Sequence, residues 1–485
     1  GNMDKNDEIL DLPATKLAAL IRKKELSPVA LIEASITRIQ ALNPVLNAVV
    51  TDNFEAARNE AKAAEKAVLE GQELGLLHGL PVGVKDLEIT KGLRTSFGSK
   101  LFADNIPAHD QSSVAALRRE GAIIIGKTNT PEFGAGGNTR NLLFGATSNP
   151  FDISKTSGGS SGGAAAGLAT GMMALATGSD YGGSVRTPSG FCGVAGFRPS
   201  PGTIPAEDKP VSLSPFSVLG PMARNIGDID LLLRAQLGAD RRDPFSVAVD
   251  YDLELPLEAA DLSSVTLLLS DDLDGAPLCA EYRQLFAEKT QALRNQAFDA
   301  RDGHPDFDGA DNAFEVLRGV NFIAAHGQKV QQHKDKLGPF VIDNVERGLA
   351  YTAADIALAH SQQSKIAKSW LAMFEGVDAV IAPACSVPPF AHENWTVKEI
   401  DGIAMPTYMS WLGLTYRPTM ALACAAAIPC GLDKNGLPFG LQVLGPPGSD
   451  RKILNIALAI EQLFASTSQT KRPCPDIASL RETGG

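Results

Sequence analysis

The sequence predicts an α/β fold, in which helices alternate with the strands of a sheet. Two short apolar runs near residues 80–85 and 121–126 predict buried strands, and a helical pattern near 111–120 separates them. A strand near 438–444 followed by a helix near 453–464 repeats this order close to the end of the chain. Such alternation is typical of a sheet that helices cover.

The N-terminal region is expected to be helical. A first helix is predicted over residues 13–24. Ser27 followed by Pro28 then provides a cap and a proline at the first helical position of a second helix. Residues 52–70 are rich in Ala, Glu and Lys, which are strong helix formers, and predict a third helix.

The remaining elements follow in chain order. Residues 200–226 are rich in Pro and Ser and are expected to form a loop, and residues after 467 a tail. The other predicted elements are a strand at 264–269, helices at 280–294, 312–332 and 353–375, and a strand at 378–381 before a loop at 382–389. The apolar run 162–178, rich in Gly and Ala, suits a buried helix and is too short to span a bilayer.

The segment 157–186 carries the strongest functional signal. It contains two Gly-Gly-Ser units, with Ser160 in the first and Ser184 in the second. A serine between glycines can present its hydroxyl beside bare backbone N–H groups, as acyl transfer requires. A Gly/Ser linker would not carry the apolar runs 165–168 and 172–175 that lie between these glycines.

A lysine closes the predicted strand near 80–85. Taken alone, Lys85 fits a solvated strand end that pairs with Asp86. In an apolar, partly buried place its pKa would instead fall below the usual value of about 10.4. Because neutral lysine is a competent general base, Lys85 is a candidate catalytic residue beside the two serines.

Taken together, these segments resemble the amidase signature family of serine hydrolases, which use Ser, cis-Ser and Lys without histidine. The resemblance spans almost the whole chain in the family's order. It rests on G-V-K-D at 83–86, G-K-T-N-T-P-E-F at 126–133, G-G-S-S-G-G at 158–163, G-S-D-Y-G-G-S-V-R at 178–186, F-C-G-V-A-G-F-R-P-S at 191–200 and G-L-P-F-G-L-Q-V-L-G-P at 436–446.

The resemblance implies one large α/β domain around a central mixed β-sheet covered by helices, over residues 3–475. N-terminal helices would occupy about 13–70 and a catalytic core about 78–200. Residues 1–2, ahead of the first methionine, are expected to be a cloning remnant.

The family pattern also assigns roles to residues of this sequence. It makes Ser184 the nucleophile, Ser160 a relay serine with a cis peptide bond, and Lys85 the base. Ser160 could accept a hydrogen bond from Ser184 and donate one to Lys85. The oxyanion hole would be formed by the backbone N–H groups of Tyr181, Gly182, Gly183 and Ser184, and the supporting residues would be Ser161, Asp180 and Arg186.

Two of these supporting residues bracket the nucleophile. Asp180 and Arg186 could bind substrate or form a structural pair that fixes the turn, and the second interpretation is favoured because buried charges are normally paired. Ser161 is expected to be a hydrogen-bonding neighbour of the relay serine.

Two other motif matches point elsewhere. Residues 121–128 fit the P-loop pattern, but the Ala and three Ile between its glycines indicate a buried strand that ends near Lys127. Residues 158–162 fit the nucleophile elbow of α/β-hydrolases, but the preceding residues 149–157 are loop-like and no later histidine stands in an evident catalytic motif.

Composition excludes several classes of protein. The chain of 485 residues carries 44 basic against 56 acidic residues, and no basic run is dense enough for a nucleic-acid stripe. Its six cysteines lack framework spacing, which indicates reduced thiols, and its dispersed histidines suggest no metal site. This composition indicates a cytoplasmic protein without a membrane span. The family resemblance further implies an enzyme without metal or other cofactor, whose partner is a small-molecule amide. The sequence is also compatible with a homodimer.

The sequence does not identify the substrate. The expected reaction is hydrolysis of a carboxamide C–N bond through an acyl-enzyme, in a pocket shaped by segments 134–143, 304–345 and 382–415. One alternative is the glutaminase subunit of a tRNA-dependent amidotransferase, although its Tyr-Tyr and Ala-Ser-Ser-Asn segments are missing. The others are an α/β-hydrolase-like esterase and a non-catalytic binding relative.

Overall fold

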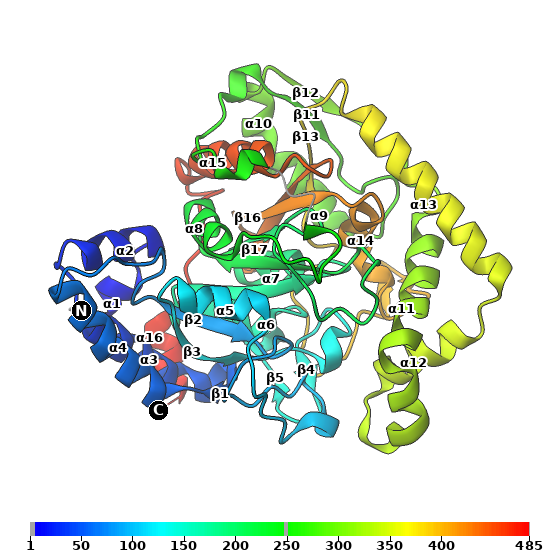
Figure 1. The fold of residues 1–485 in the computed structure, drawn as a ribbon. Helices are drawn as coiled ribbons and strands as arrows, with labels where there is room; N and C mark the ends of the chain where they lie inside the picture. Colours follow the sequence, from blue (N-terminus) through cyan, green and yellow to red (C-terminus); the bar gives the residue numbers. More distant parts are fainter. Residues whose placement is uncertain (1–4, 247–250, 485) are drawn as a thin grey trace.

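A sheet of 11 strands runs through the centre of the computed structural model, which describes residues 5–246 and 251–484 (Figure 1). The order across the sheet is β1-β3-β2-β8-β10-β9-β16-β17-β13-β11-β12. These strands are β1 Val49–Asp52, β2 Pro81–Lys85, β3 Ile123–Thr128, β8 Leu175–Asp180, β9 Ala195–Arg198, β10 Val218–Ala223, β11 Thr266–Leu269, β12 Asp299–Asp302, β13 Ala379–Pro383, β16 Cys424–Leu432 and β17 Pro438–Gly445.

The sheet is mixed. Strand β2 is parallel to both of its neighbours, β3 and β8, whereas the strands from β8 through β10, β9, β16 and β17 to β13 pair antiparallel. At the far edge, β13, β11 and β12 are parallel again. The predicted α/β class and the mixed sheet are both confirmed.

Helices cover the sheet and extend beyond it (Figure 1). The helices α1 to α4 gather with the C-terminal α16 at one end, and α11, α12 and α13 form a group on the other side. The helices are α1 Lys5–Leu10, α2 Ala14–Arg22, α3 Pro28–Leu46, α4 Phe54–Leu69, α5 Ser112–Arg119, α6 Gly162–Ala169, α7 Arg186–Cys192, α8 Ile226–Gln236, α9 Ala280–Lys289, α10 Gln291–Gln296, α11 Ala310–His333, α12 Pro339–Leu349, α13 Ala353–Met373, α14 Gly413–Met420, α15 Asp450–Ala465 and α16 Ile477–Gly484.

Local signals explain several helix boundaries. The Ser27 hydroxyl accepts hydrogen bonds from the N–H groups of Val29 and Ala30, and Pro28 opens α3, as predicted. Helix α6 is buried along its whole length and packs against β2, β3 and β8. A helix that is apolar on every face belongs inside a protein, and this position brings its N-terminal serines to the carboxyl end of β2.

Several predicted elements were wrong or incomplete. The apolar run 162–178 is not one helix, because α6 ends at Ala169 and β8 begins at Leu175. The expected loop 200–226 contains the central strand β10. There Pro221 is tolerated because pairing with β9 starts only at the next residue.

The remaining differences concern the C-terminal half and one hairpin. The expected tail after residue 467 contains helix α16. This helix packs on α3, and its Leu480 is buried. Residues 149–157 contain β7 Asp152–Thr156, which pairs with β6 Ser148–Asn149 rather than with the central sheet. The predicted helix 280–294 is divided at Thr290, and α12 and β16 were not predicted. Residues 1–3, which include the expected cloning remnant, lie outside the described residues.

No helix within the described ranges is both long and apolar enough to cross a bilayer.

Candidate active site

A buried lysine lies at the carboxyl end of β2. Lys85 is 0% exposed, and its Nζ donates hydrogen bonds to the hydroxyls of Ser160 at 2.7 Å, Ser161 at 2.8 Å and Ser179 at 3.0 Å. Ser160 and Ser161 precede α6, whereas Ser179 lies on β8 beside β2. Because β2 and β8 are parallel, their carboxyl ends meet at one edge of the sheet, and this brings Lys85 and Ser179 together.

The surroundings of this lysine favour its neutral form. Burial lowers the pKa of Lys85 to about 7, although the nearby carboxyl groups of Glu88 and Asp180 act to raise it. Asp86, which the sequence suggested as a partner, instead receives hydrogen bonds from Ser96 and lies 4.0 Å from Lys127. Among the described residues, the hydrogen-bond partners of the Lys85 Nζ are therefore all hydroxyl groups.

Glu88 and Thr177 hold the backbone of Lys85 from both sides. The Lys85 N–H donates to Thr177 Oγ1 at 3.1 Å, and the Glu88 N–H donates to the Lys85 carbonyl at 2.9 Å. The Thr177 hydroxyl in turn donates to the Glu88 carboxyl group. Glu88 is buried, which raises its pKa to about 7. Neither Glu88 nor Thr177 was predicted as a site residue, because a single polar residue in an apolar segment shows no sequence pattern that indicates a function.

The first Gly-Gly-Ser unit has an unusual backbone. The peptide bond between Gly159 and Ser160 is cis, as the family resemblance implied. Gly134 lies against the Ser160 side chain, since a Cβ atom there would stand 3.4 Å from Ser160 Oγ. The segment that carries Gly134 therefore packs directly against the Ser160 side chain.

The second Gly-Gly-Ser unit forms the turn between β8 and α7. The Ser184 carbonyl accepts a hydrogen bond from the Ser161 N–H at 3.1 Å, so the two serine segments are in direct contact. Ser184 is partly exposed, and its hydroxyl makes no hydrogen bond with any described residue. The predicted step from Ser184 to Ser160 is therefore not a formed hydrogen bond in this structure.

Three of the four predicted oxyanion donors are free. The N–H groups of Tyr181, Gly182 and Ser184 donate no hydrogen bond to a described residue. The N–H of Gly183 is different, because it donates to Asp180 Oδ1 at 3.2 Å. Gly183 also has φ +122°, a conformation that favours glycine.

Asp180 and Arg186 form a buried ion pair. Arg186 Nη2 lies 2.9 Å from Asp180 Oδ1, and Arg198 Nη1 lies 3.2 Å from the same oxygen. Burial alone would raise the pKa of Asp180, but the guanidinium groups of Arg186 and Arg198 hold it below its ordinary value. Asp180 also accepts from the Val185 N–H at 3.1 Å, so this ion-pair network fixes the Ser184 turn.

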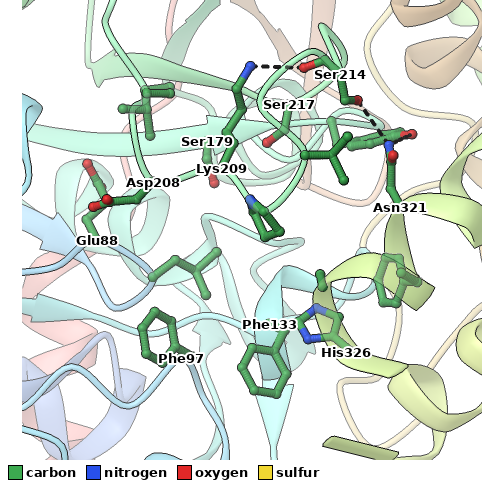
Figure 2. A pocket seen from close by; sticks show the side chains of 18 of the residues that line it. Glu88, Phe97, Phe133, Ser179, Asp208, Lys209, Ser214, Ser217, Asn321 and His326 are labelled. Carbon is green, nitrogen blue, oxygen red and sulfur yellow. Dashed lines mark hydrogen bonds between the residues drawn. The ribbon is translucent and has the colours of Figure 1, made fainter. Parts of the chain in front are cut away.

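A cavity of about 470 Å³ opens beside these residues (Figure 2). Ser179 and Tyr181 line it where it approaches Lys85 and the Ser184 turn. Figure 2 shows Phe97, Phe133 and His326 together on one side of the cavity. Most of its lining is apolar, which suits the body of a small organic molecule.

The expected pocket segments were only partly right. Residues 321–329 of α11 line the cavity, but no lining residue comes from 134–143 or 382–415. The missing walls come from 87–102 and from 206–219, a segment that the sequence indicated only as a loop. Loop composition gives no information on which site a loop covers.

The competing motifs have structural explanations. Lys127 lies within β3, and its buried Nζ donates to the Glu88 carbonyl and to the hydroxyls of Thr90 and Thr95. This geometry fits the predicted buried strand and leaves no phosphate-binding loop. The strand before Ser160 is β7, which belongs to a two-stranded hairpin and not to the central sheet as a nucleophile elbow requires.

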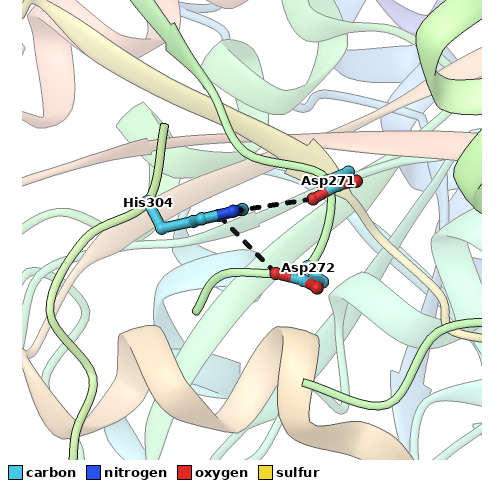
Figure 3. A group of neighbouring side chains, drawn as sticks. All are labelled: Asp271, Asp272 and His304. Carbon is cyan, nitrogen blue, oxygen red and sulfur yellow. Dashed lines mark ion pairs between the residues drawn. The ribbon is translucent and has the colours of Figure 1, made fainter. Parts of the chain in front are cut away.

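One group of possible metal ligands lies far from these residues in the sequence. Among the described residues, only Asp271, Asp272 and His304 bring three such side chains together (Figure 3). Arg283 Nη1 already lies 2.8 Å from Asp271 and 3.0 Å from Asp272, and the Ser270 hydroxyl bonds the His304 ring at 2.7 Å. These ion pairs and this hydrogen bond explain why the three side chains lie together, without a metal ion. None of the six cysteines, all of which lie in the described ranges, forms a disulfide.

The geometry defines a class of site: a buried lysine, bonded to serine hydroxyls, next to a glycine-rich turn with free N–H groups. The family model described as Amidase matches residues 30–454. An acylamidase of Rhodococcus erythropolis is 30% identical over 93% of this chain and 95% of that protein. A glutamyl-tRNA(Gln) amidotransferase subunit of Geobacter metallireducens is also 30% identical, over 95% of this chain and 99% of that protein.

A solved structure shares the fold. The crystal structure of a bacterial aryl acylamidase of the amidase signature family superposes with a TM-score of 0.85 and 23% identity, over 98% of both chains. The chain belongs to the amidase signature family, and it is an amide hydrolase.

Proposed function

We propose that this enzyme hydrolyses linear carboxamides through a serine acyl-enzyme, with Ser184 as nucleophile, Ser160 as relay and Lys85 as base. One observation carries the proposal: the Lys85 Nζ lies 2.7 Å from the Ser160 hydroxyl, and both side chains are buried. A buried lysine with a pKa of about 7 is neutral in a large fraction of molecules at physiological pH, so it can accept a proton.

The proton would travel in both directions along the same path. Lys85 takes the proton of Ser160 as Ser160 takes that of Ser184, and the Ser184 oxygen attacks the amide carbonyl carbon. The N–H groups of Tyr181, Gly182 and Ser184 are available for the oxyanion. The relayed proton then passes to the amide nitrogen as the C–N bond breaks. Water releases the acid from Ser184 by the reverse path.

Covalent labelling tests the nucleophile. A fluorophosphonate probe should modify Ser184, and peptide mass spectrometry should locate the adduct there. Ser184→Ala should abolish both labelling and turnover. Ser154→Ala is the matched control, because this exposed serine lies on β7, where its hydroxyl bonds Asp152 and not Lys85. Labelling of Ser160 alone in an active preparation would refute the assignment.

A second candidate is the glutaminase subunit of a tRNA-dependent amidotransferase, which the amidotransferase relatives support. A screen of aryl, aliphatic and amino-acid amides with glutamine as one arm separates the two, with ammonia release as the readout. Ester substrates test the esterase alternative. We expect small-molecule amides to be cleaved in the cytoplasm without a partner protein. Turnover of glutamine alone would favour the second candidate.

A further inference from the structure

Aromatic rings enclose one end of the cavity. We call the five side chains Phe97, Phe102, Phe133, Phe322 and His326, all of which line it, the aromatic box. Neighbouring ring centroids lie 5.1 Å apart for Phe97 and Phe102, 6.0 Å for Phe97 and Phe133, and 4.5 Å for Phe133 and His326. The rings thus support one another at distances typical of aromatic pairs.

Two rings of the box stand on strained backbone. Phe97 has φ +56° and Phe133 has φ +51°, in the left-handed region that bulky residues avoid. Both residues are only half-buried, and Phe133 also packs against the small apolar cluster that contains Val330 and Val341. Strained backbone conformations persist where the surroundings enforce them, and they cluster at ligand-binding sites.

The histidine of the box behaves as a neutral aromatic ring. Burial, with the nearby charges of Lys329 and Arg318, lowers the pKa of His326 to about 3. Its Nδ1 is buried without a hydrogen-bond partner among the described residues. The five side chains of the box are therefore uncharged, while the cations Lys329 and Arg318 lie against the rings of Phe133 and Phe322, at 5.5 Å and 4.4 Å from the ring centroids.

The box adjoins the reacting groups. Phe133 is followed directly by Gly134, which packs against the Ser160 side chain, and Tyr181 lines the same cavity next to the free N–H groups. The box and Ser179, whose hydroxyl accepts a hydrogen bond from Lys85, thus line one cavity, so a ring in the box can belong to a molecule whose amide group lies near the Lys85–Ser160 pair.

We propose that the aromatic box binds an uncharged aryl ring of the substrate, which makes aryl-bearing amides the preferred substrate class. This inference rests on the proposed amide hydrolysis at the same site. A phenyl ring can stack on or point its edge at the surrounding rings, whereas a saturated ring of similar size gains only apolar burial.

Matched amides test the inference. One series compares 2-phenylacetamide with 2-cyclohexylacetamide, and the other compares N-benzylacetamide with N-(cyclohexylmethyl)acetamide. The methylene group insulates the amide from the ring, so the members of each pair have similar intrinsic reactivity. We expect kcat/KM to favour the phenyl member by about two- to tenfold in the series whose ring occupies the box.

Two variants probe the box and one variant serves as control. Phe133→Leu and His326→Leu should each move the phenyl-to-cyclohexyl ratio toward one. Phe374→Leu, which removes a ring packed on Trp370 outside the cavity, should leave the ratio unchanged. Circular dichroism checks folding, and His326→Leu decides the question if Phe133→Leu does not fold.

The outcomes separate this inference from the proposed function. If the enzyme cleaves both members of each pair equally, or if neither box variant changes the ratio, the aryl preference is refuted and amide hydrolysis stands. If no amide is cleaved, the proposed function fails. Calorimetric binding of 2-phenylacetamide and 2-cyclohexylacetamide then decides the preference alone, and equal affinities would overturn it.

Discussion

The pH dependence of activity is the sharpest test of the lysine base. At pH 7.4, a lysine with the ordinary pKa of 10.5 is neutral in about 0.1% of molecules, whereas one with a pKa of about 7 is neutral in about 70%. Burial of Lys85 therefore increases the reactive fraction roughly a thousandfold. We expect kcat/KM to rise with pH through about 7 and then to reach a plateau.

A second buried group titrates in the same range and must be distinguished. Glu88 also has a pKa of about 7. The rise of kcat/KM with pH, which is the acidic limb of the profile, could therefore reflect deprotonation of either residue. The substitution Glu88→Gln separates them, because it removes a carboxylate that raises the pKa of Lys85. If Lys85 is the base, the limb should persist and move to lower pH, by on the order of one unit.

The assay is a pH–rate profile of kcat/KM for the parent, Glu88→Gln and Lys85→Arg, with near-UV circular dichroism to confirm folding at each pH. Lys85→Arg keeps the positive charge but cannot lose it, so it should be inactive throughout. Loss of the limb in Glu88→Gln would assign it to Glu88. An active Lys85→Arg enzyme would refute the base assignment altogether.

Three further predictions concern the turn and the chemistry. Asp180→Asn leaves two buried guanidinium groups without their carboxylate, so it should lower the free energy of unfolding by about 3–5 kcal/mol. Urea titrations measure this loss, and a loss below about 1 kcal/mol would contradict the proposed role of the ion-pair network. Gly183→Ala places a Cβ 2.1 Å from Thr415 Oγ1 at φ +122°, so kcat should fall at least about tenfold, and an unimpaired variant would show that the turn adapts. Activity should survive EDTA and dialysis because Lys85 supplies the base, and restoration by a divalent ion would revive a metal mechanism.

The sequence predicted the elements with strong local signals and missed those that depend on distant partners. Helix α3 follows from its Ser27 cap and Pro28, and β2 from a short apolar run. Strand β10 was missed because Pro221 indicates a loop, and only the partial pairing with β9 makes it acceptable in a central strand. Helix α16 was missed because its contact with α3 joins opposite ends of the chain.

The site divides in the same way. Lys85, Ser160 and Ser184 lie in motifs, so a resemblance could identify them before any geometry was known. Ser179 lies in the 178–186 motif but was given no role, and Glu88 lies outside the motifs. What distinguishes both residues is the group they contact across neighbouring strands or within a tight turn. The cavity walls at 206–219 could not be predicted, since a loop's position follows from the whole fold.

The charges around the site explain how one buried region lowers the pKa of both a lysine and an aspartate. Asp180 has two guanidinium groups and two backbone N–H donors, which outweigh the cost of its burial. Lys85 has three hydroxyl groups and no carboxylate in contact, so its burial is not offset and its pKa falls. A carboxylate at the position of Ser179 would reverse this balance by pairing with the ammonium. Partners that are hydroxyl groups rather than carboxylates are therefore what would allow Lys85 to serve as the proposed base.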